Sequence, residues 1–268
     1  EPSDNGLSTQ LQAFWGSWDD VANDPSSLAS RTALLQSADS LASSLHRATA
    51  DLTAVKDTAT AGLIDIANET NDLAAQIANI NTKIVGDPAA ANDLMDQREL
   101  LVNKLATLTG AEARPADSGQ IDVYIGGRAI VSGPMSFTID GAGGALRWAV
   151  DNQPVVAPSG KAATLTATIT DIVPRYQALL DDIASTLVTQ VNGLHTTGYD
   201  QSSTTGRNFF DPANTTAATI SLSADVKGLP QNVAAGAPVL PGPTAPVLLD
   251  GEMAQKLAAL ADGVGSPD

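Results

Sequence analysis

Apolar residues at the start of the chain follow helical spacing. Steps of four and three residues separate Leu7, Leu11, Phe14, Trp18 and Val21. This spacing places all five side chains on one face of a helix, and core packing is the ordinary role of such a stripe.

A second and much longer helix is predicted directly afterwards, starting at Asp24 and Pro25, an N-cap residue followed by a good first helical residue. Its apolar face is a heptad seam at alternating steps of four and three. The seam consists of Leu34, Ala38, Leu41, Leu45, Ala48, Leu52, Val55, Ala59, Gly62, Ile66, Thr70, Leu73, Ile77, Ile80 and Ile84. We expect a helix over about 25–85, roughly 90 Å long at 1.5 Å per residue, with its seam facing partner helices along its whole length.

Gly86, Asp87 and Pro88 predict a sharp turn into a third helix. The face of this helix is lined by Leu94, Arg98, Leu101, Leu105 and Leu108, and Gly110 ends it. Because the turn is short, we expect this helix to run antiparallel to the end of the long one.

The spacing then changes to the alternation of β-strands. Strand-like runs occur at 121–125, 129–131, 136–140, 145–150 and 165–169, and glycines separate several of them. Such runs between glycine turns indicate hairpins. We expect residues 111–170 to form a small β unit that could be removed without unfolding the helices.

Helical spacing returns in the last third of the chain. The next apolar face consists of Ile172, Tyr176, Leu179, Ile183, Leu187, Val191 and Leu194. Pro174 falls in the first turn of this predicted helix, where proline is tolerated, and Gly198 is expected to stop it. A loop rich in Ser, Thr and Pro follows at about 200–250, with a strand-like run at 218–222. A last helix is predicted to begin near Met253.

These elements predict the α+β class, in the form of an elongated antiparallel helical bundle with a long coiled-coil-like helix and an inserted small β domain. Three domains are expected: the first part of a helical rod at 1–110, the β domain at 111–170, and the second part of the rod at 171–268.

Composition excludes several classes of function. The chain of 268 residues has 14 Lys and Arg against 30 Asp and Glu, a net charge of −16, which disfavours binding to nucleic acid. It contains no cysteine, so disulfides, thiol catalysis and Cys-ligated metals are excluded. No apolar run reaches the length of a membrane span, and no signal peptide is recognisable.

Candidate chemistry is sparse, and we predict no catalytic, cofactor-binding or metal-binding residues. The two histidines, His46 and His195, are interpreted as a residue on a solvated helix face and a structural residue closing a helix. No serine lies in a nucleophile elbow or beside a base. The oxygen ligands near Asp200 lack the spacing of a calcium loop, and Phe209 and Phe210 are interpreted as anchors that pin the polar loop to the bundle.

Four stretches together resemble a known family. The first joins 11–14, Pro25 and 29–31; the second is 92–101, from Asn92 through Asp96, Gln97 and Arg98 to Leu101, followed by Leu105, Leu108 and Gly110. The third is 123–126. The fourth stretch comprises Tyr176, Leu179, Asp182, Leu187, Val191, Asn192, Leu194, His195, Gly198, Tyr199 and Asp200, followed by Phe209 and Phe210. In this order they resemble the flagellar hook-associated protein 1 family, over most of the chain to about residue 225.

The resemblance implies a structural, non-enzymatic protein that joins hook to filament in the bacterial flagellum and is exported through the flagellar secretion channel to the cell exterior. Implied partners are other copies of itself, the hook protein, the second junction protein, and an export chaperone that binds the family's C-terminal helix. That helix and the family's N-terminal segment are missing from this sequence. Three alternatives remain: a flagellin-type filament subunit, a flagellum-associated hydrolase on a helical scaffold, and a coiled-coil adhesin.

Overall fold

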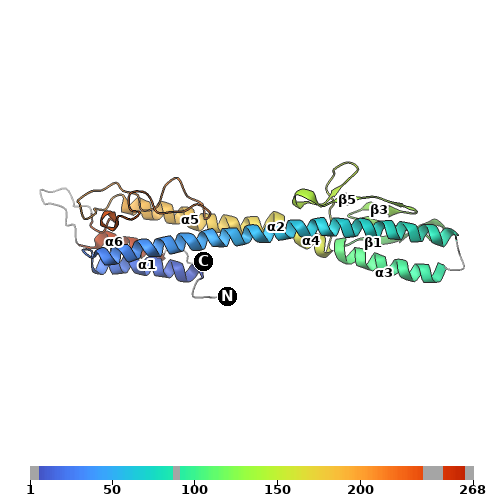
Figure 1. Ribbon diagram of the computed structural model, residues 1–268, viewed down its shortest axis with the longest axis horizontal. Coiled ribbons are helices and arrows are strands. Elements are labelled where there is room, and N and C mark those ends of the chain that lie inside the picture. The colour runs from blue at the N-terminus through green and yellow to red at the C-terminus, as the bar shows by residue number, and fades with distance from the viewer. Residues whose placement is uncertain (1–5, 87–90, 238–249, 263–268) are drawn as a thin grey trace. The chain divides into compact units, whose positions relative to one another are not determined.

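The computed structural model describes residues 6–86, 91–237 and 250–262, and the chain divides into two compact units (Figure 1). One unit comprises residues 1–52 with 176–268, and the other comprises residues 53–175. Helices α2 (Leu28–Gly86) and α5 (Val173–His195) both contain a boundary between these units.

The core of the first unit is aromatic at its centre. Helix α1 (Leu7–Asn23) buries the predicted face through Phe14, Trp18 and Val21. Phe14 contacts both Phe209 and Phe210, with ring centroids 6.0 Å and 5.9 Å away, which confirms these two residues as anchors. Helix α6 (Glu252–Ala258) confirms the predicted last helix and adds Met253 and Leu257 to the same core.

Helix α2 begins three residues later than predicted, and its cap is a different residue. Ser27 accepts a hydrogen bond on its Oγ from the Ser30 backbone N–H at 3.1 Å, the contact that defines an N-cap side chain. Asp24 instead follows the end of α1. The Pro25 carbonyl has a separate role, because it accepts hydrogen bonds from the guanidinium of Arg31.

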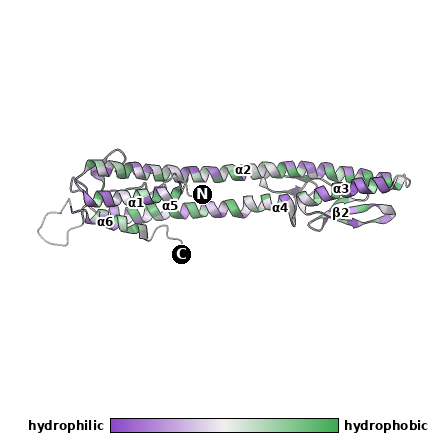
Figure 2. Ribbon diagram, turned by 90° about the horizontal axis from the view of Figure 1, so that it is seen from below, coloured by the Kyte–Doolittle hydropathy of each residue, from purple (hydrophilic) through white to green (hydrophobic). Residues whose placement is uncertain are grey.

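The heptad seam of α2 is confirmed as a buried face in two stretches. Leu34 to Leu45 belong to the first core and Ala59 to Ile77 belong to the second, while Ile80 and Ile84 are also buried. Between them, from 46 to 58, no residue is buried, and Val55 is 49% exposed. The prediction that the seam is covered along its whole length is therefore wrong for this stretch. Figure 2 shows apolar and polar residues interleaved along the helix.

The second unit packs helices against two small antiparallel sheets. Helix α3 (Ala91–Thr109) ends at Gly110, whose φ of +68° favours glycine. The predicted turn at Gly86–Asp87–Pro88 lies largely outside the described residues. The larger sheet has the order β1-β2-β3-β4, with β1 (Glu112–Pro115), β2 (Ile121–Ile125), β3 (Arg128–Ser132) and β4 (Met135–Ser136). Strands β5 (Ile139–Asp140) and β6 (Arg147–Trp148) form the smaller sheet.

The strand predicted at 165–169 is wrong, because these residues are helical. Helix α4 (Gly160–Ala167) continues through a π-helical turn (Thr168–Ile172) into α5. In that turn the Val173 N–H reaches the Thr168 carbonyl, five residues back. This widened turn precedes Pro174, which cannot donate a hydrogen bond and whose ring would crowd a carbonyl four residues back. The helix therefore passes through Pro174 and begins at Gly160.

The segment 199–237 folds onto the first unit mostly as turns. The strand predicted at 218–222 is reduced to one isolated bridge, Phe210↔Leu222, because tight turns occupy residues 216–219. Gly198 does not end α5, which stops at His195. A side chain at Gly198 would lie 2.7 Å from Met253 Cγ and 3.0 Å from Ala234 Cβ, so glycine is needed there for close packing.

The fold belongs to the α+β class, with a helical bundle and an inserted antiparallel β unit. The boundaries at 110 and 170 stay a prediction. The expectation that the β unit is removable finds no support, because Val123, Ile130 and Trp148 share one core with Leu63 and Ile77 of α2.

Candidate functional site: buried polar clamps

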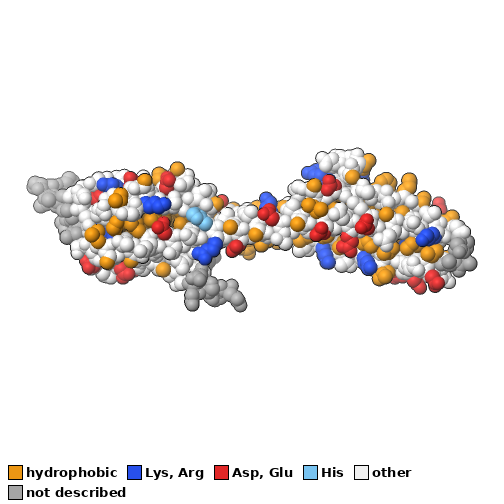
Figure 3. Space-filling view, viewed as in Figure 1, with side chains coloured by type: hydrophobic (Ala, Val, Ile, Leu, Met, Phe, Trp, Pro, Cys, Tyr) orange, Lys and Arg blue, Asp and Glu red, His pale blue; other side chains and the backbone are white. Residues whose placement is uncertain are grey.

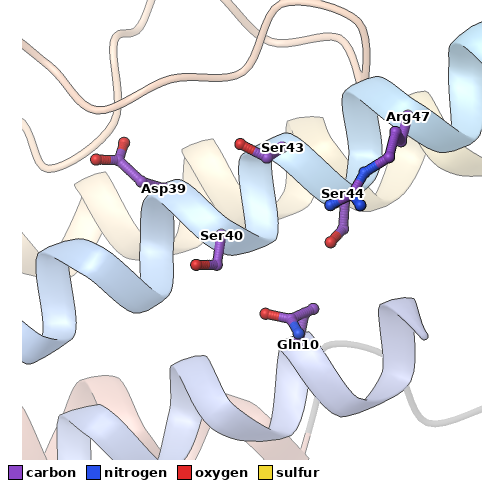
Figure 4. A pocket seen from close by; sticks show the side chains of 6 residues that line it. All are labelled: Gln10, Asp39, Ser40, Ser43, Ser44 and Arg47. Carbon is purple, nitrogen blue, oxygen red and sulfur yellow. The ribbon is translucent and has the colours of Figure 1, made fainter. Parts of the chain in front are cut away.

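The described surface has several depressions. One, of about 290 Å³, is lined by Gln10, Asp39, Ser40, Ser43, Ser44 and Arg47. Figure 4 shows Gln10 of α1 and Ser40 of α2 pointing into the space between the two helices, whereas Asp39 points away from it. No histidine lines this depression, so its serines have no imidazole base beside them.

Two further observations concern the described residues as a whole. In residues 6–86, 91–237 and 250–262, no group of three or more His, Asp or Glu side chains is placed to hold a metal ion. In the same residues no helix has the length and apolar character needed to cross a membrane. On the face drawn in Figure 3, acidic and basic side chains are scattered, and the basic ones do not gather.

The Gln97–Arg98 stretch contributes to a buried network in the second unit, which we call the Asn81 clamp. Asn81 of α2 is fully buried, and its Nδ2 donates to the carbonyls of Ile121 at 2.8 Å and Gly133 at 2.7 Å. Its Oδ1 accepts from the Ile121 N–H at 3.2 Å and from Arg98 Nη1 at 2.8 Å. Arg98 also donates to the Gly119 carbonyl at 2.8 Å. The clamp therefore joins α2, α3 and the larger sheet.

Burial lowers the pKa of Arg98 below its ordinary value, because the apolar surroundings disfavour the charged form. Its guanidinium still carries a charge at neutral pH, and its hydrogen bonds to Asn81 and Gly119 offset the cost of burial.

Another asparagine of α2, Asn71, forms a smaller contact of the same kind with the smaller sheet. Asn71 Nδ2 donates to the Ile139 carbonyl and Asn71 Oδ1 accepts from the Ile139 N–H, both at 2.9 Å.

The fourth of the stretches that carry the family resemblance forms the Asn192 clamp in the first unit. Asn192 Oδ1 accepts from the N–H groups of Phe209 and Phe210, both at 2.9 Å, and its Nδ2 donates to the Phe210 carbonyl at 2.8 Å. One turn further, His195 contacts the backbone of Arg207 and Ala234. Both residues therefore hold the segment 199–237 on the end of α5.

Asp200 and Arg31 complete this network. Asp200 accepts from the N–H groups of Ser202 at 2.7 Å and Thr204 at 2.8 Å, and from Arg207 Nε at 2.9 Å. These contacts use both carboxylate oxygens of Asp200. Arg31, fully buried, also donates to the Val233 carbonyl. Burial lowers its pKa to about 10, an effect that the nearby Asp200 charge partly opposes.

The polar groups of both clamps hold segments of the chain together. His46, predicted on a solvated face, is exposed but its Nε2 lies 2.9 Å from the Ile220 carbonyl. Sequence reasoning missed the roles of Asn71 and Asn81. The only sequence signal for these two residues is that each directly follows a seam position of α2, Thr70 or Ile80.

The fold and its clamps define a helical domain with an inserted antiparallel β unit, held together by internal polar contacts. Residues 1–210 match the family model described as the flagellar hook-associated protein FlgK helical domain, and the chain belongs to that family.

Individual relatives agree with this assignment. The chain is 25% identical over 229 residues to flagellar hook-associated protein 1 of Salmonella typhimurium, covering 77% of the chain and 41% of that protein. It is 27% identical over 122 residues to flagellar hook-associated protein 1 of Bacillus subtilis, covering 44% of the chain and 24% of that protein. The solved flagellar hook junction protein FlgK from Burkholderia pseudomallei superposes with a TM-score of 0.68 at 26% identity, over 77% of this chain and 40% of that one. The chain thus spans less than half the length of these relatives.

Proposed function

We propose that the chain is the helical domain of a structural subunit of the bacterial flagellum, which joins the hook to the filament. The observation that carries this proposal is the family match over residues 1–210, supported by the likeness to a solved hook junction protein. The clamp residues support it as well, because the stretches that carry the family resemblance contain Arg98, Asn192 and His195, which hold this fold together.

The proposal extends to partners, location and chemistry. The subunit assembles with other copies of itself between the hook protein and the second junction protein. It works outside the cell after export through the flagellar channel, with a chaperone bound to a C-terminal helix beyond this sequence. It catalyses no reaction and needs no cofactor or metal. This fits the Asn81 and Asn192 clamps, whose polar groups form hydrogen bonds within the chain.

Electron microscopy of isolated flagella with gold-labelled antibodies raised against this chain tests the proposal. A junction subunit gives label at one position, between hook and filament. Label along the whole filament would identify a filament subunit instead, and flagella without label would point to the hydrolase or the adhesin. Flagella from a strain that lacks the gene serve as the control for antibody specificity, and that strain should carry hooks without attached filaments.

A further inference from the structure

The last residue of α5, His195, is fully buried and makes a hydrogen bond through each ring nitrogen. Nδ1 lies 2.8 Å from the Arg207 carbonyl, and Nε2 accepts from the Ala234 N–H at 2.9 Å. A carbonyl can only accept and a backbone N–H can only donate. The ring is therefore neutral, with its proton on Nδ1.

These bonds connect the helix end to two separate parts of the segment 199–237. Arg207 directly precedes the Asn208–Phe210 stretch, and Ala234 lies in a short stretch, 230–236, that returns to the helix. The same stretch is held by the bridge Tyr199↔Gly236 and by Arg31, which donates to the Val233 carbonyl. The imidazole is enclosed by rings, with Trp18 6.3 Å and Phe209 5.4 Å away between centroids.

The charged groups around His195 come from two places. Helix α2 contributes Arg31, and the segment 199–237 contributes Asp200, Asp225 and Arg207, of which Asp200 and Arg207 are paired at 2.9 Å. Helix α1 contributes the uncharged ring of Trp18. A second proton on the imidazole would be placed on Nε2, against the Ala234 N–H, and its charge would add to that of Arg31.

We propose that His195 is an acid-sensitive latch: a second proton on its ring breaks the bond to Ala234 and releases the stretch 230–236 from the end of α5. The inference is independent of the proposed function, because it rests on contacts within one unit.

The direction of the pH effect follows from the pKa. The pKa of His195 is lowered from 6.5 to about 4 in the closed state. Burial is the largest cause and the charge of Arg31 acts in the same direction, while the bond to Arg207 and the charges of Asp225 and Asp200 partly oppose them. Because the open state binds the proton more tightly, the stability that the latch contributes is complete above pH 6.5 and falls as the pH decreases toward 4. With these two values, the equilibrium constant for opening rises about 30-fold between pH 7.5 and pH 5.

Hydrogen exchange followed by mass spectrometry on the whole chain tests the latch, with rates corrected for the intrinsic effect of pH. We expect exchange in peptides covering 230–236 to accelerate about 30-fold from pH 7.5 to pH 5, while a peptide from α2 within 73–84 stays unchanged. Equal protection at both pH values, or the same acceleration in both peptides, would overturn the proposal without any variant being needed.

Two variants identify the titrating group. His195→Gln keeps an acceptor near Ala234 but does not titrate, so the acceleration should disappear. His46→Gln, the matched control, removes the other imidazole and should leave it intact. Acceleration that survives in His195→Gln would show that another group causes the opening and would refute the latch.

Discussion

Three buried or half-buried asparagines on helices form hydrogen bonds with backbone groups in the way that a neighbouring strand would. Asn71, Asn81 and Asn192 each use one amide both to donate to and to accept from the backbone of a segment far along the chain. Sequence patterns placed Asn192 and Arg98 within signature stretches but gave no role to Asn71 or Asn81. An amide side chain has no periodic signal, and only the position of the strand shows whether it meets a backbone or water. This is why the clamps could be predicted only in part.

Thr70 offers a test of the seam at this scale. Its side chain is fully buried on α2, and within the described residues its Oγ1 has no hydrogen-bond partner. Thr70→Val replaces that hydroxyl by a methyl group of similar size, so we expect the free energy of unfolding to rise by about 1 kcal/mol. Urea unfolding measures this change.

Thr109 provides the matched control, because it is equally buried but its Oγ1 donates to the Leu105 carbonyl at 2.9 Å. Thr109→Val should therefore lose about 1 kcal/mol. If both valine variants lose stability to the same extent, the hydroxyl of Thr70 has a partner after all.

At the scale of elements, the long heptad pattern and the alternating runs at 121–125 and 129–131 were predicted well, whereas the runs at 165–169 and 218–222 were not. Helix α2 was expected over about 25–85 and spans Leu28–Gly86, because a heptad seam fixes both type and length. Residues 165–169 alternate apolar with threonine, which reads equally as a strand. Tertiary contacts favour the helix there, because Leu165 packs directly over Gly62 of α2. A Cβ atom added at Gly62 would lie only 2.9 Å from Leu165 Cδ1.

A charge in the covered part of the seam should be costly. Ile77 is fully buried in the second core, so Ile77→Asp places a carboxylate among apolar side chains and should cost about 3 kcal/mol or more. Gln76→Asp, on the exposed face of the same helix, should change stability by less than about 0.5 kcal/mol. Thermal or urea unfolding compares the two, and equal stability of both variants would show that the seam assignment is incorrect.

At the scale of the whole molecule, the chain has two cores, and the second combines residues of the predicted rod with residues of the predicted β domain. The change of periodicity near residue 111 marks a change of secondary structure, but secondary structure does not define which residues share a core. Val123, Trp148 and Ala162 complete the same cluster as Leu63 of α2 and Leu105 of α3.

Removal of residues 112–167 with a short Gly-Ser replacement should therefore unfold more than the deleted part. The second core would lose its strands and α4, leaving the apolar faces of α2 and α3 exposed to water. We expect circular dichroism to show loss of helix beyond that of α4 itself, with α1 and the α5 residues after 176 retaining hydrogen-exchange protection. Full retention of helix in α2 and α3 would mean that these helices need no sheet.

The uncovered stretch of α2 has a consequence for how this helix opens. A helix normally frays from its ends, and amides near its middle are the last to exchange with solvent. Here each end of α2 is anchored in a core, whereas residues 46–58 contribute no buried side chain. The order is thus reversed: the slowest amides lie in two separate blocks, and the middle of the helix exchanges first. Each block should then report the unfolding of its own core, so that one continuous helix yields two different free energies of opening.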